Sequence, residues 1–117
     1  MKTKKILIVE DDNSYQKALK LALSDEGFDV ITADNGESAL NLTKKTKIDL
    51  ILLDILMPEM DGIEFSYKLQ NNTQIKIPVI ILTNLAKAAY PADVKDYIIK
   101  ANTSLSEIVD KVKKYLQ

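Results

Sequence analysis

Four apolar residues followed by three acidic ones stand near the start of the sequence, Ile6-Leu7-Ile8-Val9-Glu10-Asp11-Asp12. A short aliphatic run that ends at a polar turn is typical of a strand buried on both faces of a parallel sheet. Four further segments of this kind follow, at 28–33, 49–54, 78–83 and 94–100. The first, third and fourth of the five segments are the most apolar, so we expect them at the centre of the sheet and the other two nearer its edges.

Helical patterns separate these segments. We expect Asn13 or Ser14 to cap the first helix, which should end before Gly27, where a glycine suits the C′ position. The last helix is the best marked, because Ser104 and Glu107 form a capping box ahead of a regular apolar face. Two weaker helical patterns lie between them, at 37–45 and 62–70.

The alternation of strands and helices predicts an α/β fold, a doubly wound five-stranded parallel sheet in one domain over residues 1–117. One crossover is short, because only ten residues, 84–93, separate the fourth and fifth segments, and Pro91 interrupts them. A parallel crossover usually needs a dozen or more residues that include a helix. We therefore expect the fourth crossover helix to be shortened or missing, unless the fifth segment pairs in another way.

The composition excludes several kinds of chemistry. The 117 residues include no histidine, cysteine, arginine or tryptophan. Catalytic triads and zinc sites of the usual nitrogen or sulfur type are therefore excluded. The 17 acidic residues and the hydroxyl groups remain, and oxygen ligands suit hard cations such as Mg²⁺ or Ca²⁺.

The charge balance bears on partners and location. A net charge of −1 gives no electrostatic signature for nucleic acid, so we expect no direct nucleic acid binding. The apolar run 6–9 is too short for a signal peptide or a membrane span. We therefore expect a cytoplasmic protein that does not contact a membrane.

Polar residues at the ends of the expected strands are the candidates for function. Glu10, Asp11, Asp54, Thr83 and Lys100 all stand at such ends, and in an open parallel sheet ligands bind there. Each alone would be an ordinary turn or surface residue. Together, clustered carboxylates repel one another unless a cation neutralises them, and a lysine and a hydroxyl beside them suit an incoming phosphoryl group. An aspartate can itself become an aspartyl phosphate.

Two runs make the sequence resemble the receiver domain of bacterial two-component response regulators, of the chemotaxis-regulator-like type. They are residues 6–12 and Asp54-Ile55-Leu56-Met57-Pro58-Glu59-Met60-Asp61-Gly62, and the second resembles the specific loop that follows the phosphoacceptor aspartate of that family. The runs 80–83 and 97–100 agree in type and order. The resemblance implies a flavodoxin-like sheet in the order 2-1-3-4-5.

The resemblance also implies a metal site. Asp54 looks like the aspartate that takes a phosphoryl group from a phosphohistidine, with Mg²⁺ as cofactor. Asp11 looks like a direct ligand of the ion, and Glu10 acts mainly through water. Leu56 would contribute its backbone carbonyl, so its side chain need not be polar. Asp12 has a weaker case and is an alternative cap for the first helix.

Three further residues match family positions that contact the phosphoryl group or respond to it. Thr83 would hydrogen-bond it, Lys100 would pair with one of its oxygens, and Tyr97 matches an aromatic residue that turns inward when Thr83 is drawn toward the phosphate. Lys100 is followed by Ala101, whereas the family usually has proline after a cis peptide bond. A cis bond without proline costs about 3 kcal/mol, so the geometry at Lys100–Ala101 is left open.

The function that follows is a signalling domain rather than an enzyme. Leu56 and Leu85 lie two residues after Asp54 and Thr83, at positions that the resemblance implies influence hydrolysis of the aspartyl phosphate. Apolar side chains cannot orient an attacking water, so we expect at most slow autodephosphorylation. The partners implied are a histidine kinase or phosphotransfer protein in trans and an unidentified output partner, with the chain as a monomer or a weak phosphorylation-dependent dimer. The main alternative is a pseudo-receiver, a protein-interaction module that acts without phosphorylation. A haloacid-dehalogenase-type hydrolase or a flavin-binding domain fits less well.

Overall fold

The computed structural model describes residues 3–54, 77–83 and 96–116. Its five strands form one parallel sheet in the order β2-β1-β3-β4-β5, which confirms the sequence prediction. The strands are β1 (Lys5–Val9), β2 (Asp29–Ala33), β3 (Leu50–Asp54), β4 (Val79–Thr83) and β5 (Asp96–Ile99). The helices are α1 (Asn13–Asp25), α2 (Gly36–Lys45), the short 3₁₀ helix η1 (Lys100–Asn102) and α4 (Leu105–Leu116).

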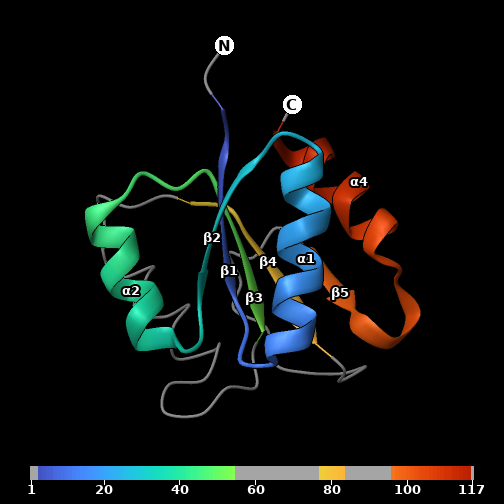
Figure 1. The fold of residues 1–117 in the computed structure, drawn as a ribbon, viewed down its shortest axis with the longest axis horizontal. Coiled ribbons are helices and arrows are strands. Elements are labelled where there is room, and N and C mark those ends of the chain that lie inside the picture. The colour runs from blue at the N-terminus through green and yellow to red at the C-terminus, as the bar shows by residue number, and fades with distance from the viewer. Residues whose placement is uncertain (1–2, 55–76, 84–95, 117) are drawn as a thin grey trace.

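Helices cover both faces of the sheet. Figure 1 shows α1 and α4 on one face and α2 on the other. Successive residues of β1 enter different cores: Ile6 and Ile8 pack with α1 and α4, whereas Leu7 and Val9 pack on the side of α2. Burial on both faces explains why the central strands read as continuous aliphatic runs instead of alternating.

The segment ends agree with the expected ones to within a few residues, with two corrections. Asp12, rather than Asn13 or Ser14, caps α1, because its carboxylate accepts hydrogen bonds from the N–H groups of Ser14 and Tyr15 at 3.0 and 3.2 Å. The alternative role of Asp12 as a cap is thereby confirmed. The fifth strand ends at Ile99, and Lys100 begins η1 instead of ending the strand.

Two sequence signals at other helix ends are confirmed. Gly27 follows α1 with a φ of 93°, the left-handed conformation expected of a C′ glycine. At α4, the Glu107 N–H donates to Ser104 Oγ at 3.1 Å and the Ser104 N–H donates to Glu107 Oε1 at 3.1 Å, so the capping box is formed.

A side-chain network ties α4 to the edge strand. Asp96, the first residue of β5, accepts hydrogen bonds from Lys111 Nζ at 2.9 Å and from the Tyr115 hydroxyl at 3.2 Å. Burial alone would raise the pKa of Asp96, but these bonds and the N–H of Tyr97 outweigh it and lower the pKa. A second ion pair, Lys113 with Glu26, joins α4 to the end of α1. The position of α4 is therefore set by polar contacts as well as by its apolar face.

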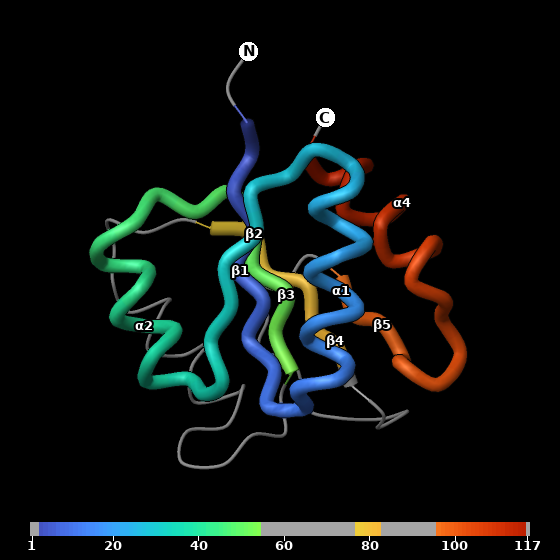
Figure 2. The backbone as a smooth tube through the Cα atoms, in the orientation of Figure 1, coloured from blue at the N-terminus to red at the C-terminus, as the bar shows by residue number. Residues whose placement is uncertain are grey.

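Two sequence predictions lie outside the described residues, namely the helix at 62–70 and the shortened fourth crossover at 84–93. Within residues 3–54, 77–83 and 96–116, none of the helices has the length and apolar composition of a membrane-spanning segment. Figure 2 shows that the carboxyl ends of β1 and β3 lie together at the edge from which α1 starts.

The positive φ of Gly27 predicts a specific pattern of stabilities. A Cβ at this position would meet no atom within 4 Å, so replacement adds backbone strain without a clash. We expect Gly27→Ala to lower the free energy of unfolding by about 1–2 kcal/mol, and Gly27→Asn by less, because asparagine tolerates the left-handed region better. Urea unfolding measures both, with the exposed Ser24→Ala as control; equal stability of Gly27→Ala and wild type would contradict the assignment.

Candidate acidic site at the carboxyl ends of the strands

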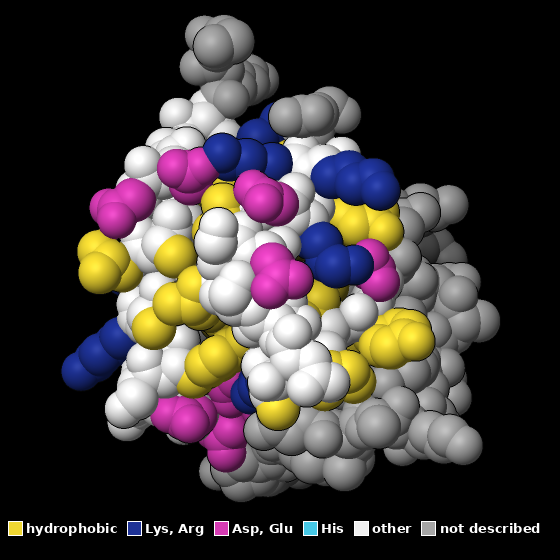
Figure 3. All heavy atoms as spheres, turned by 90° about the vertical axis from the view of Figure 1, so that its right-hand side faces the viewer, with side chains coloured by type: hydrophobic (Ala, Val, Ile, Leu, Met, Phe, Trp, Pro, Cys, Tyr) yellow, Lys and Arg dark blue, Asp and Glu magenta, His cyan; other side chains and the backbone are white. Residues whose placement is uncertain are grey.

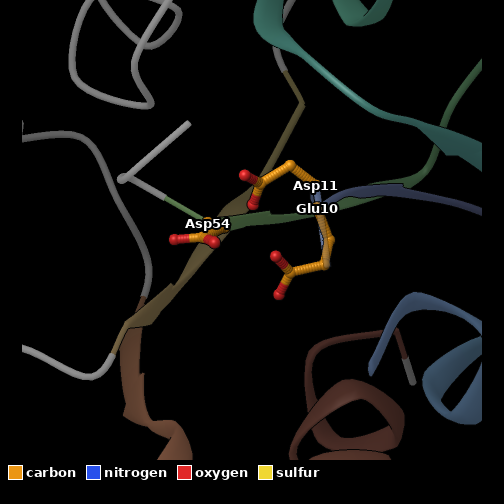
Figure 4. Close-up of side chains that lie close together, drawn as sticks. All are labelled: Glu10, Asp11 and Asp54. Atoms are coloured by element: carbon orange, nitrogen blue, oxygen red, sulfur yellow. The ribbon is translucent and has the colours of Figure 1, made fainter. Parts of the chain in front are cut away.

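Three carboxylates meet where β1 and β3 end. Val9 of β1 pairs with Leu53 of β3, so the next residues of the two strands emerge side by side. Glu10, Asp11 and Asp54 each present a carboxylate oxygen, and these oxygens lie within 4.8 Å of one another. Figure 4 shows the three side chains gathered around one space. The structure therefore brings together the three predicted metal ligands whose side chains it describes.

The three carboxylates differ in their exposure to solvent. The residue Glu10 is 0% exposed and Asp54 is 6% exposed, whereas Asp11 is exposed. Buried carboxylates need hydrogen bonds or a neighbouring cation, because water no longer solvates their charge. The N–H of Asp12 donates to Glu10 Oε2 at 3.2 Å, which satisfies one of the buried oxygens.

Lys100 supplies the cation. Its Nζ donates to Glu10 Oε1 and, at 3.3 Å, to Asp54 Oδ2. No peptide bond among the described residues is cis, so the Lys100–Ala101 bond is trans and the lysine reaches the carboxylates from the start of η1. The geometry that the sequence left open is thereby decided.

The electrostatics of the site reflect this crowding. Burial raises the pKa of the Glu10 carboxyl to about 7, with Asp54 acting in the same direction and Lys100 in the opposite one. Burial lowers the pKa of Lys100, but Glu10 and Asp54 outweigh it and the net shift is upward. Lys100 thus stays charged at neutral pH, whereas the pKa of Glu10 itself lies near neutral pH.

Two residues of α1 complete the site and were missed as site residues in the sequence. Gln16 donates from Nε2 to the carbonyl of Glu10 at 2.8 Å and to Asp34 Oδ1 at 3.0 Å. It therefore links the residue after β1 to the residue after β2. Tyr15 lies with its ring centroid 4.7 Å from Lys100 Nζ. In the sequence Tyr15 shares the helical spacing of Ala18, Leu19 and Ala22, and no local signal distinguishes a core tyrosine from one beside a lysine.

The remaining predicted residues are described in part or lie elsewhere. Thr83 ends β4 and its backbone pairs with Ile99, the residue before Lys100, but the description does not extend to its side chain. Tyr97 is 49% exposed on β5, which is an outward position. Leu56 and Leu85 lie outside the described residues.

The donor set fits Mg²⁺. The ion prefers oxygen ligands and usually takes one or two carboxylates while keeping several waters. Two of the three clustered carboxylates are enough to meet that requirement, and the exposed Asp11 adjoins the solvent from which water ligands would come. Histidine and cysteine, the usual nitrogen and sulfur ligands of zinc, are absent from the whole sequence, which disfavours zinc.

Comparisons with known proteins agree on one family. A family model described as the response regulator receiver domain matches residues 6–113. The chain is 42% identical over 80 residues, 68% of its length, to the alkaline phosphatase synthesis transcriptional regulatory protein PhoP of Bacillus subtilis. It covers 33% of that relative, so it spans well under half of the longer protein.

Two solved structures are similar over nearly the whole chain. A putative response regulator from Chloroflexus aurantiacus has a TM-score of 0.90 at 30% identity, with 98% of each chain covered. The response regulator TrrA from Thermotoga maritima, solved in complex with Mg(2+)-BeF, has a TM-score of 0.85 at 31% identity, with 97% of this chain and 99% of that chain covered.

The raised pKa of Glu10 predicts a pH dependence of stability in metal-free protein. The carboxyl has an ordinary pKa of 4.5 when unfolded and one of about 7 when folded. Between these values the folded protein binds more protons than the unfolded chain, so the contribution of Glu10 to stability is lost as pH rises through this window. We expect urea unfolding in EDTA to show this loss in wild type and a flatter curve in Glu10→Gln.

Lys100 does not confuse this measurement. Its pKa lies far above this pH window, so it does not contribute to the dependence of the free energy of unfolding on pH there. Saturating Mg²⁺ is expected to reduce the difference between wild type and Glu10→Gln near neutral pH, because a divalent cation stabilises the ionised carboxylate. Identical pH profiles of the two proteins in EDTA would contradict the assignment.

Proposed function

Because this chain belongs to the response regulator receiver domain family of two-component systems, we propose that it accepts a phosphoryl group on Asp54, in the cytoplasm, from the phosphohistidine of a partner protein. Receiver domains are signalling rather than catalytic modules, and slow autodephosphorylation is the most that we assign to this one. The observation that supports the proposal is the cluster of Glu10, Asp11, Asp54 and Lys100 at one edge of the sheet.

The contacts of Asp54 suit an in-line transfer. In the proposed reaction a carboxylate oxygen of Asp54 attacks the phosphorus atom, the phosphorus–nitrogen bond of the donor breaks, and the electron pair returns to the imidazole. Such a transfer needs positioning and neutralisation of charge more than covalent help. Lys100 Nζ lies 3.3 Å from Asp54 Oδ2, close enough to pair with an oxygen of the bound phosphoryl group.

The metal ligands are part of the same proposal. Asp11 and Asp54 would hold Mg²⁺ directly, Glu10 would act through water, and Leu56 would add its backbone carbonyl. The ion would offset the negative charge on the phosphoryl oxygens as they approach the carboxylates. The related TrrA structure was solved in complex with Mg(2+)-BeF, which supports Mg²⁺ as the ion of this proposal.

Thr83 and Tyr97 are the proposed switch. Thr83 pairs with Ile99 through the backbone, so a shift of Thr83 toward the phosphoryl group reaches the strand that carries Tyr97. The N–H of Tyr97 donates to Asp96 Oδ1 at 2.8 Å, and the same carboxylate binds α4 through Lys111. We propose that Tyr97, exposed in the structure, turns inward on phosphorylation and changes the surface beside α4.

The proposed partners follow from the chemistry. The chain contains no histidine, so the phosphohistidine of a kinase or phosphotransfer protein must come from another molecule. Acidic and basic side chains are interspersed on the face shown in Figure 3, which favours a protein partner for output over direct contact with nucleic acid. A monomer or a weak phosphorylation-dependent dimer remains the expected state. The pseudo-receiver alternative is not favoured, because Glu10, Asp11, Asp54 and Lys100 are all in place in the described part of the site.

Phosphorylation at Asp54 is directly measurable. After treatment with acetyl phosphate and Mg²⁺, intact-mass analysis is expected to show one added phosphoryl group on wild type and none on Asp54→Asn, because an amide cannot form the acyl phosphate. Asp110→Asn, an exposed aspartate on α4, is the matched control and should react as wild type does. EDTA should suppress the reaction. If wild type gains no group, even from a cognate kinase, the pseudo-receiver becomes the better description.

The switch makes a separate prediction. With fluorotyrosine in place of tyrosine, the Tyr97 signal, assigned from Tyr97→Phe, should lose accessibility to a soluble paramagnetic agent when Mg²⁺ and beryllofluoride are added. Thr83→Ala should bind the phosphoryl analogue yet leave Tyr97 exposed, because the hydroxyl that draws the strand inward is missing. Thr103→Ala, after η1, is the control. An inward turn of Tyr97 that persists in Thr83→Ala would contradict the proposed coupling.

A further inference from the structure

Tyr15 and Lys100 come from opposite ends of the chain and meet at the acidic site. Tyr15 lies in the first turns of α1, and Lys100 begins η1 after the edge strand. The ammonium nitrogen of Lys100 is 4.7 Å from the centroid of the Tyr15 ring. A cation within about 6 Å of an aromatic centroid, over its face, is attracted by the negative charge of that face.

The ring adds a third contact to a cation that already has two. Lys100 Nζ donates to Glu10 Oε1 and to Asp54 Oδ2, and its side chain is 13% exposed. Water therefore screens these interactions weakly, and a ring face beside the ammonium counts for more than it would at the surface. An ammonium held in this way stays where its two carboxylate partners are.

The hydroxyl of Tyr15 makes no comparable contribution. It is buried and has no hydrogen-bond partner in the part of the chain that the structure describes. Burial raises the pKa of Tyr15, and the charges of Lys100, Glu10 and Asp54 also act on it, so the phenol is close to the charged group. The contact of Tyr15 with the site is therefore made by its ring.

Lys100 and Mg²⁺ would compete for the carboxylate oxygens of Glu10 and Asp54. The lysine binds one oxygen of Glu10 and one of Asp54, and these residues belong to the cluster whose donors fit the metal. Two cations beside the same carboxylates repel each other, so whatever stabilises one there weakens the other. An interaction that holds the ammonium in place must then reduce the affinity for the metal.

We propose that Tyr15 is a positioning residue whose ring holds the Lys100 ammonium against Glu10 and Asp54 as an internal counter-cation, with which Mg²⁺ must compete. This inference rests on the proposed function only for the presence of the metal. It predicts that the ring lowers the affinity for Mg²⁺ while keeping Lys100 ready to pair with a phosphoryl oxygen on Asp54.

Three variants separate the ring from the hydroxyl and from the core. Tyr15→Phe keeps the ring and removes the hydroxyl, whereas Tyr15→Leu removes the ring and keeps an apolar side chain. Phe28→Leu is the matched control, because Phe28 is also a partly buried aromatic residue packed against the same core. It is the residue just before β2. Should Tyr15→Leu fail to fold, Tyr15→Met replaces it, since methionine fills irregular space more easily.

The first measurement is the affinity for Mg²⁺. It can be followed by the backbone amide signal of Asp12, whose N–H donates to Glu10 Oε2. We expect Tyr15→Leu to bind Mg²⁺ about three- to tenfold more tightly than wild type, the range that corresponds to a cation–π contact of ordinary strength. Tyr15→Phe and Phe28→Leu should bind as wild type does. A core defect without a role at the site would give Tyr15→Leu and Phe28→Leu the same affinity.

The second measurement needs no metal. The ammonium signal of Lys100, identified by its loss in Lys100→Gln, should be observable in metal-free wild type, Tyr15→Phe and Phe28→Leu, and lost to exchange with water in Tyr15→Leu. Retention of the signal in Tyr15→Leu overturns the proposal, and so does a Tyr15→Phe variant that behaves like Tyr15→Leu, because the hydroxyl would then be the active group. If wild type binds no Mg²⁺, the metal in the proposed function fails, while the ammonium signal still decides the role of Tyr15.

Discussion

The ion pairs that the Lys100 ammonium forms with Glu10 and Asp54 are the interaction on which the site depends. The residue Glu10 is 0% exposed and Asp54 6%, and a carboxylate removed from water is costly unless a cation or hydrogen bonds replace the lost solvation. Lys100 supplies that cation from 90 positions away in sequence from Glu10 and 46 from Asp54. The three groups therefore join β1, β3 and the end of β5 at one edge of the sheet.

The sheet order shows why this cation needs a long side chain. Glu10 follows β1 and Asp54 ends the neighbouring strand β3, whereas β5 is separated from β3 by β4. A long flexible side chain can cross that gap and bury its stem while its charged end reaches the carboxylates. The trans bond to Ala101 and the turn of η1 bring the lysine to the right place, and the ring of Tyr15 covers the ammonium from α1.

The same geometry relates the site to the surface. Thr83 ends β4 and Lys100 follows the adjacent strand β5, so in the proposed switch a change at Asp54 would reach both strands. Asp96, at the other end of β5, binds Lys111 and Tyr115 of α4. A strand held by polar contacts at both ends can pass a small displacement to the helix beside it without disturbing the apolar core. This is the physical basis of the proposed switch at Tyr97.

The five strands, the central position of the most apolar ones and the cluster of Glu10, Asp11, Asp54 and Lys100 could all be predicted from the sequence. Continuous apolar runs mark strands that are covered on both faces, and the carboxyl ends of such strands share an edge. The sequence left the cap of α1 open, since Asp12, Asn13 and Ser14 are all good capping residues and only the backbone conformation chooses among them. The trans bond after Lys100 and the place of Tyr15 could be read only from the folded chain. Helical periodicity shows that a tyrosine faces inward, but which charged group it meets depends on how α1 and η1 pack together, and no local pattern carries that information.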